Sequence, residues 1–326
     1  MKPWKLILVG LAVLAAALPA ILLGPFSLRL REVLPDSTAG FHAAYYLYVS
    51  KTARQRADDG RPVVMLVQPN NSGVNSDDEE VHRKDAWWTA FGRHYLAEDL
   101  GVVLLVPVFI RPDQDWQVYT HALDRDSLTT ERADLARPDL QLLAMVDHAR
   151  AALAAEDIRV EEKIFIQGFS ASAMFANRFT LLHPDRVLAC AAGSPGGWPL
   201  APAARSGAED LPYPAGIADL ESLTGSAFDA QNFRSVEQLL VLGDQDDNDS
   251  LDFRDGWDEA AAAQVDRLFG ANPLARWDEA ARLYREAGAQ ARFLLVPGVG
   301  HDRKKLQRHS TEFFRQALAR LEKVSH

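Results

Sequence analysis

The 326-residue sequence contains a single cysteine, Cys190, which excludes an internal disulfide and any metal cluster held by several cysteines. It also lacks an extended basic run, and its formal net charge is −10. A nucleic-acid partner requires lysines and arginines that neutralise phosphates, so this composition argues against one. No internal repeat and no low-complexity tract is present.

Apolar residues make up 48% of the sequence, so a chain of this length can bury a large core. Short apolar runs predict strands at residues 43–50, 61–68, 102–109, 163–167, 187–192, 238–242 and 291–296. Helical spacing is found at residues 84–100, 140–155, 171–182, 257–268, 273–288 and 304–322. This alternation predicts an α/β fold with a mostly parallel central sheet and helices on both faces.

Residues 1–26 have the layout of an export segment. Lys2 and Lys5 precede an uncharged apolar run that extends to residue 26 and is about long enough, at roughly 20 residues, to cross a bilayer. Small residues at 15–17 offer a cleavage site, but cutting there would leave an apolar end at residues 18–23. We expect export to the periplasm or the cell exterior, with a membrane anchor favoured over a cleaved signal, and a folded domain at residues 27–326.

The stretch KIFIQGFSASAMFANRF at residues 163–179 carries the main chemical signal. An apolar strand turns abruptly into a helix at Ser170, as in a nucleophile elbow, where the sharp turn exposes the serine hydroxyl above the sheet. Gly168 allows the helix to pass close to the strand. Ser172 stands where a second glycine is usual, which leaves open that Ser170 is an ordinary serine in a turn.

Polar residues follow four of the predicted strands. Asn70 and Asn71 follow the second strand, Ser170 the elbow strand, residues 244–249 (DQDDND) the sixth and His301 the last. Ligands and catalytic groups of parallel sheets gather beyond the carboxyl ends of the strands. The order serine, aspartate, histidine is the order found in hydrolases built on such a sheet.

Several of these segments together carry a family resemblance. The sequence from residue 41 onward, with GFSAS at the elbow, HPDRV after it, and the strand ends LLVLGDQD and VPGVGHD, resembles the α/β-hydrolase superfamily. Within it the chain is similar to serine esterases and polyester-depolymerase-like proteins. The resemblance implies the α/β-hydrolase fold, and the long segment at residues 193–233 is then expected to be an inserted lid or cap.

The resemblance also assigns roles to the polar residues. Ser170 would be the nucleophile and His301 the base that accepts its proton. Asp246 would be the acid that orients the imidazole, although Asp247 and Asp249 remain possible.

The oxyanion hole is expected to use the backbone N–H of Ala171 and an amide from Asn70 or Asn71. The usual His-Gly pair is absent from that turn, so the inward-pointing amide is not defined. Residues 244–249 also resemble the start of a calcium loop, but they lack its sixth-position glycine and final glutamate. A serine hydrolase that works through an acyl-enzyme needs neither a metal nor an organic cofactor, so we expect none.

The sequence thus predicts a serine hydrolase that cleaves a small or polymeric carboxylic ester through an acyl-enzyme. A thioesterase or peptidase would use the same groups. The rival from another class is an inactive hydrolase fold that binds or scaffolds other molecules, because Ser172 departs from the elbow motif. Nothing in the sequence indicates an oligomeric state.

Overall fold

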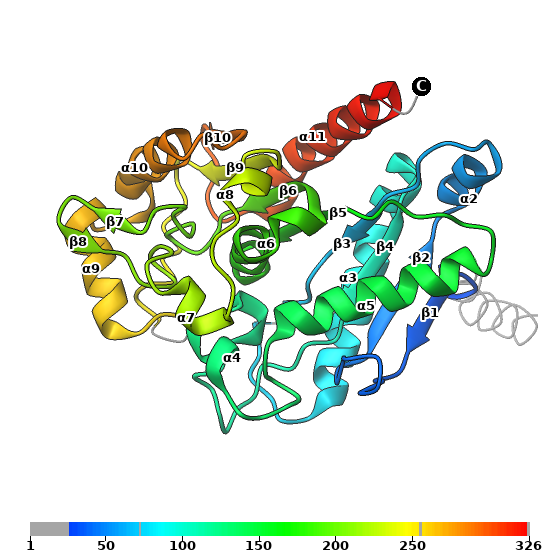
Figure 1. The fold of residues 1–326 in the computed structure, drawn as a ribbon, viewed down its shortest axis with the longest axis horizontal. Coiled ribbons are helices and arrows are strands. Elements are labelled where there is room, and N and C mark those ends of the chain that lie inside the picture. Colours follow the sequence, from blue (N-terminus) through cyan, green and yellow to red (C-terminus); the bar gives the residue numbers. More distant parts are fainter. Residues whose placement is uncertain (1–25, 72, 254–255, 325–326) are drawn as a thin grey trace, which may run out of the picture.

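The computed structural model describes residues 26–71, 73–253 and 256–324, and an eight-stranded sheet lies at its centre (Figure 1). The order of the strands across this sheet is β1-β2-β4-β3-β5-β6-β9-β10. The strands are β1 (Leu30–Val33), β2 (Tyr45–Val49), β3 (Met65–Val67), β4 (Val103–Pro107), β5 (Ile164–Phe169), β6 (Val187–Gly193), β9 (Glu237–Gly243) and β10 (Ala291–Val296). From β4 to β10 all neighbours are parallel, whereas β2 pairs antiparallel with both β1 and β4, so the predicted mostly parallel sheet is confirmed.

Both faces of this sheet are buried. On β4, Val103 and Leu105 pack into one core cluster, while Leu104 and Val106 pack into another. Successive side chains of a strand point to opposite faces, so the continuous apolar runs in the sequence reflect burial on both sides.

Helices cover the two faces. One core contains apolar residues of α3 (Glu79–Leu100) and α11 (Arg303–Val324). The opposite core contains residues of α5 (Pro138–Ala154), α6 (Ala171–Leu182) and α10 (Pro273–Glu286). Figure 1 shows α5 and α6 on the near side of the sheet and α10 at its β10 end. The predicted helices on both faces are therefore present.

A segment of mostly irregular structure connects β6 to β9. It contains a small hairpin, β7 (Arg205–Ser206) and β8 (Glu209–Asp210), and two short helices, α7 (Leu220–Thr224) and α8 (Ala230–Phe233). Trp198 is buried there and stacks on Phe269 of α9 (Glu259–Phe269) with ring centroids 4.3 Å apart. The predicted lid at residues 193–233 corresponds to this segment, and its role stays a prediction.

Some short elements lay outside the sequence-based prediction, including β1, the helix α2 (Lys51–Asp58) and the helix α4 (Arg125–Thr129). Helix α3 also begins five residues earlier than expected, because Asp78 caps it by accepting the N–H of Glu80. Among the described residues no helix is long and apolar enough to span a membrane. The predicted export segment at residues 1–26 lies, except for Phe26, outside the described residues.

Candidate active site

Ser170 lies at the junction of β5 and α6, with backbone angles φ 59° and ψ −127°. These angles are rare for a residue with a side chain, so neighbouring structure must hold them in place. A Cβ atom on Gly168 would lie 2.0 Å from the carbonyl oxygen of Ser172, so only glycine fits at that position. The local sequence thus forms the sharp strand-to-helix turn that it predicts.

The unusual serine of the motif has a definite position in this turn. The hydroxyl of Ser172 accepts the backbone N–H of Phe169 at 3.0 Å and donates to the carbonyl oxygen of Phe169 at 2.9 Å. Ser172 is buried, with 2% of its surface exposed. Its side chain therefore ties the first turn of α6 to the end of β5, which a glycine at this position would not do.

His301 and Asp246 lie together beyond the ends of β10 and β9. The Nδ1 atom of His301 is 3.1 Å from each carboxylate oxygen of Asp246. A Cβ on Gly243 would lie 2.0 Å from the carbonyl oxygen of Val299, so the absence of a side chain there lets the His301 loop cross the end of β9. Since a carboxylate only accepts, the His301 proton is assigned to Nδ1, which leaves Nε2 as an acceptor.

The other two candidate aspartates lie elsewhere. Asp249 forms a buried ion pair with Arg276, with Nη1 2.8 Å from Oδ2. Asp247 is exposed. Burial pushes the pKa of Asp246 up, but hydrogen bonds from His301 and from the Ser194 hydroxyl outweigh it and hold that pKa below its usual value. Asp246 is thus the carboxylate that the structure brings to His301, and Ser194 is a partner that sequence reasoning missed.

Ser170 and His301 are linked through Phe169. The rings of Phe169 and His301 are in contact, with centroids 4.5 Å apart, and Ser170 is the next residue in the chain. Within the described residues the Ser170 hydroxyl forms no hydrogen bond, with His301 or with any other group. Hydrogen bonds of catalytic groups are often long before substrate binds, so a catalytic pair does not require this hydrogen bond in the free protein.

The predicted oxyanion residues differ in their surroundings. Ala171 begins α6, where the first backbone N–H groups of a helix have no partner inside the helix. Asn70 is fully buried; its side chain accepts the backbone N–H of Phe109 at 3.0 Å and donates to the same residue's carbonyl oxygen at 2.9 Å. The Nε2 of His121 also reaches this carbonyl, at 2.7 Å. The Asn70 side chain therefore joins the ends of β3 and β4, where both its oxygen and its amide nitrogen have partners.

Both donor groups of Asn71 also have partners. Its side-chain amide donates to the carbonyl oxygen of Phe169 at 3.3 Å, and its backbone N–H interacts with the carboxyl group of Asp85. Burial raises the pKa of Asp85, and the Asn71 amide partly opposes that rise. The Ala171 N–H is the donor nearest in sequence to Ser170, and the oxyanion roles of Ala171 and of a second donor both stay predictions.

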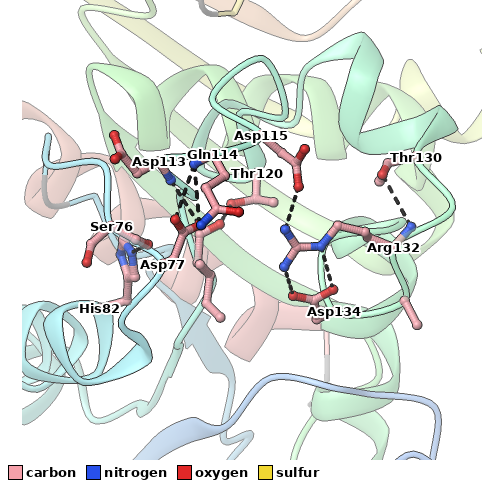
Figure 2. Close-up of polar contacts among 12 residues, drawn as sticks. Ser76, Asp77, His82, Asp113, Gln114, Asp115, Thr120, Thr130, Arg132 and Asp134 are labelled. Atoms are coloured by element: carbon pink, nitrogen blue, oxygen red, sulfur yellow. Dashed lines mark hydrogen bonds and ion pairs between the residues drawn. The ribbon is translucent and has the colours of Figure 1, made fainter.

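The loop that follows Asn71 is anchored to the loop after β4. Figure 2 shows the Asp77 carboxylate facing the backbone N–H groups of Asp113 and Gln114, each at 3.2 Å. The carbonyl oxygen of Ser76 lies 2.9 Å from Nε2 of the buried His82. These contacts restrict the turn that carries the candidate oxyanion residues.

A cavity of about 240 Å³ adjoins His301, and its wall includes Phe169, Asn71, Ser172, Arg93 and Arg303. Sequence reasoning had not selected the two arginines, because nothing local distinguishes Arg93 in a predicted helix, or Arg303 just before one, from other charged residues. Among the residues that the structure describes, no group of three or more histidines, cysteines or acidic residues is arranged to hold a metal ion.

Comparisons with known proteins agree with this architecture. No protein-family model matches the sequence, and no curated protein matches it. Among solved structures, poly(aspartic acid) hydrolase-1 from Sphingomonas sp. KT-1 is similar with a TM-score of 0.59 at 16% identity, over 87% of this chain and 97% of that chain. A poly(3-hydroxybutyrate) depolymerase from Bordetella parapertussis has a TM-score of 0.54 at 18% identity, over 86% and 90%.

An S-formylglutathione hydrolase from Agrobacterium tumefaciens is similar with a TM-score of 0.50 at 16% identity, over 90% of this chain and 94% of that chain. At such identities the likeness concerns the fold. It extends over nearly the whole length of all three structures, and the strand-to-helix elbow at Ser170 occupies the centre of the sheet. The chain therefore has the fold of the α/β-hydrolase superfamily, as its sequence predicts.

Proposed function

We propose that this protein is a serine hydrolase that cleaves a carboxylic ester through a covalent acyl-enzyme, with Ser170 as nucleophile, His301 as base and Asp246 as the orienting acid. The observation that supports it most is the Asp246–His301 contact, beside a serine in a strained elbow. His301 and Asp246 are 55 positions apart in sequence yet are in contact, and the ring of Phe169, the residue before Ser170, contacts the His301 ring.

In the first half of the reaction the Ser170 oxygen attacks the ester carbonyl carbon while its proton passes to Nε2 of His301. The tetrahedral intermediate then collapses, the bond to the leaving oxygen breaks, and His301 gives the proton to the departing alcohol. In the second half a water molecule loses a proton to His301 and attacks the acyl carbon. The carboxylic acid leaves and the proton returns to Ser170.

Two groups stabilise the charges that develop. Asp246, with its pKa held low, remains a carboxylate and stabilises the imidazolium form of His301. The backbone N–H of Ala171 lies at the start of a twelve-residue helix, where a negative oxygen is favoured. An amide of Asn70 or Asn71 would supply the second donor.

Thioester or amide cleavage would use the same groups, and an inactive binding protein remains the rival from another class. Substrates named for the similar structures include a polyester and a formylated thiol. We therefore propose a small or polymeric ester for this chain. We also propose, from the sequence, that residues 1–26 direct export and favour a membrane anchor, and that residues 193–233 form a cap.

A fluorophosphonate probe tests the proposal directly, because it forms an adduct only with an activated serine. We expect labelling of the wild type at Ser170, no labelling of Ser170→Ala, and loss of turnover of a short activated ester in His301→Ala with little change in thermal stability. Well-folded wild-type protein that takes up no probe and cleaves no ester would favour the inactive binding protein.

A further inference from the structure

The cavity beside His301 has an unusual electrostatic character for this acidic chain. Two guanidinium groups line it, Arg93 from the middle of α3 and Arg303 from the start of α11. Its remaining wall includes the candidate base and the turn at Asn71. At about 240 Å³ it has room for roughly eight water molecules, hence for a substrate group of several heavy atoms.

Arg93 is a buried cation with neutral partners. Only 6% of its surface is exposed, its Nε donates to Oε1 of Gln68 at 3.1 Å, and its Nη1 donates to Oε1 of Gln307. Burial, together with the positive charge of Arg303, lowers the pKa of Arg93 to about 10. The group is therefore charged at neutral pH, and a buried charge without an opposite charge is costly.

Arg303 adds a second cation at the mouth of the same cavity. Its side chain is exposed and, within the described residues, it has neither a hydrogen bond nor an ion pair. It is the first residue of the 22-residue helix α11, whose N-terminal end also favours a negative group.

The nearby carboxylates do not neutralise this pair. Asp85 interacts electrostatically with Arg303 but forms no ion pair with it and does not line the cavity. The Asp302 carboxylate accepts the backbone N–H groups of Lys304 and Lys305 at 2.9 and 3.2 Å, and so caps α11. Both guanidinium groups thus retain unused donors next to the candidate base.

We propose that this cavity binds a free carboxylate of the substrate through Arg93 and Arg303. The inference rests on the proposed function: the ester that this enzyme cleaves carries an anionic group a few bonds from the scissile carbonyl, on either its acyl or its alcohol side. Guanidinium groups bind carboxylates through paired, charge-assisted hydrogen bonds. An anion here neutralises the charge of the buried Arg93 and places the scissile bond beside His301.

Matched esters test this specificity. One pair is mono-4-nitrophenyl glutarate and its methyl-capped diester, with the carboxylate on the acyl side. The second pair is the butyrate ester of 4-hydroxybenzoic acid and that of its methyl ester, with the carboxylate on the alcohol side. We expect kcat/KM of the wild type to favour the free acid over its capped twin at least about tenfold in one pair, from charge-assisted hydrogen bonds. A ratio near or below one in both pairs overturns the proposal.

The arginine dependence is tested in the favoured pair. Arg303→Gln, at an exposed position, is expected to reduce severalfold the ratio of kcat/KM for the free acid to kcat/KM for its capped twin. Salt at about 0.5 M should reduce the same ratio in the wild type. The matched control Arg308→Gln removes an exposed arginine from the same helix away from the cavity and should leave the ratio unchanged. Equal ratios in Arg303→Gln and in the wild type would contradict the proposed site.

Direct binding separates this site from the proposed reaction. Calorimetric titration of Ser170→Ala with glutarate should detect binding that weakens at least about tenfold when Arg303→Gln is added. If that binding is found but no ester is cleaved, the carboxylate site stands and the proposed reaction fails. If both capped esters are cleaved as fast as the free acids, the reaction stands and the carboxylate site fails.

Discussion

The hydroxyl of Ser194 lies 2.5 Å from Oδ2 of Asp246, on the same carboxylate that His301 contacts through Nδ1. Asp246 is 2% exposed, so few other groups are available to stabilise its charge. Ser194 follows β6 directly and adopts a positive φ of 48°. We therefore regard it as a positioning residue for the candidate acid.

Replacing this serine changes the dependence of stability on pH. A carboxyl whose folded-state pKa is lowered contributes stability above its ordinary pKa and loses it as the pH falls through the folded value. Ser194→Ala removes a donor, so the pKa of Asp246 rises toward its ordinary value. We expect a loss of about 1–2 kcal/mol in the free energy of unfolding at pH 7, shrinking toward pH 3.5. Urea titrations at both pH values measure it, and a difference that does not vary with pH would argue against this role.

The candidate acid itself is tested by Asp246→Asn. An asparagine keeps the size but allows the wrong His301 tautomer, so we expect kcat on a short activated ester to fall roughly 10³–10⁴-fold. The matched control Asp247→Asn removes an exposed charge one residue away and should retain full activity. Equal activity of the two variants would remove Asp246 from the proposed role.

The serine in place of the second elbow glycine is expected to contribute to stability. Ser172→Ala removes two hydrogen bonds to Phe169 and leaves a backbone N–H without its partner. We expect it to lower the free energy of unfolding by roughly 1–2 kcal/mol. Ser172→Gly, which restores the usual motif, should cost about 0.5–1 kcal/mol more, because glycine is unfavourable in a helix. Denaturant titration measures both, and a glycine variant more stable than the wild type would refute this account.

His121 is expected to make the fold sensitive to acid. Burial, with smaller contributions from the nearby His82 and Arg111, lowers its pKa to about 3, although the hydrogen bond to the Phe109 carbonyl opposes this shift. Its ordinary value is about 6.5, so the unfolded chain binds an additional proton between these two values, and stability falls as the pH falls from about 6.5.

His121→Gln keeps a donor for Phe109 but does not titrate. Between pH 7 and pH 4.5 we expect the wild type to lose about 2 kcal/mol more of its free energy of unfolding than this variant. Urea titrations at intervals of half a pH unit measure the free energy of unfolding of both proteins. If the two plots of this free energy against pH are parallel, His121 does not control the acid response.

The buried pair of Arg276 and Asp249 holds the segment after β6 in place. Arg276 is 1% exposed and also donates to the carbonyl oxygens of Gly197, at 3.3 Å, and Gly270, at 2.7 Å. Arg276→Met leaves Asp249 buried without its partner, so we expect a loss of about 3–5 kcal/mol in the free energy of unfolding.

Adding Asp249→Asn to Arg276→Met should restore part of that loss, because the unpaired charge is removed. Thermal and denaturant unfolding of the two single variants and the double variant measure the coupling. A double variant no more stable than Arg276→Met would show that the ion pair is not what stabilises this segment.

The sequence alone determined the features that depend on residues close together in the sequence. Apolar runs buried on both sides specify the parallel strands, and the steric requirement at Gly168 specifies the sharp turn at Ser170. The position of His301 in the loop that follows the last strand is also indicated by local pattern.

Only the tertiary structure decided which distant groups meet. Three aspartates within four positions are equivalent in sequence, yet Asp246 contacts His301 while Asp249 pairs with Arg276. Likewise, no local pattern brings Arg93 and Arg303 to one cavity. The reason is physical: propensity and periodicity act over a few residues, whereas the packing of helices and loops on the sheet sets the contacts between segments.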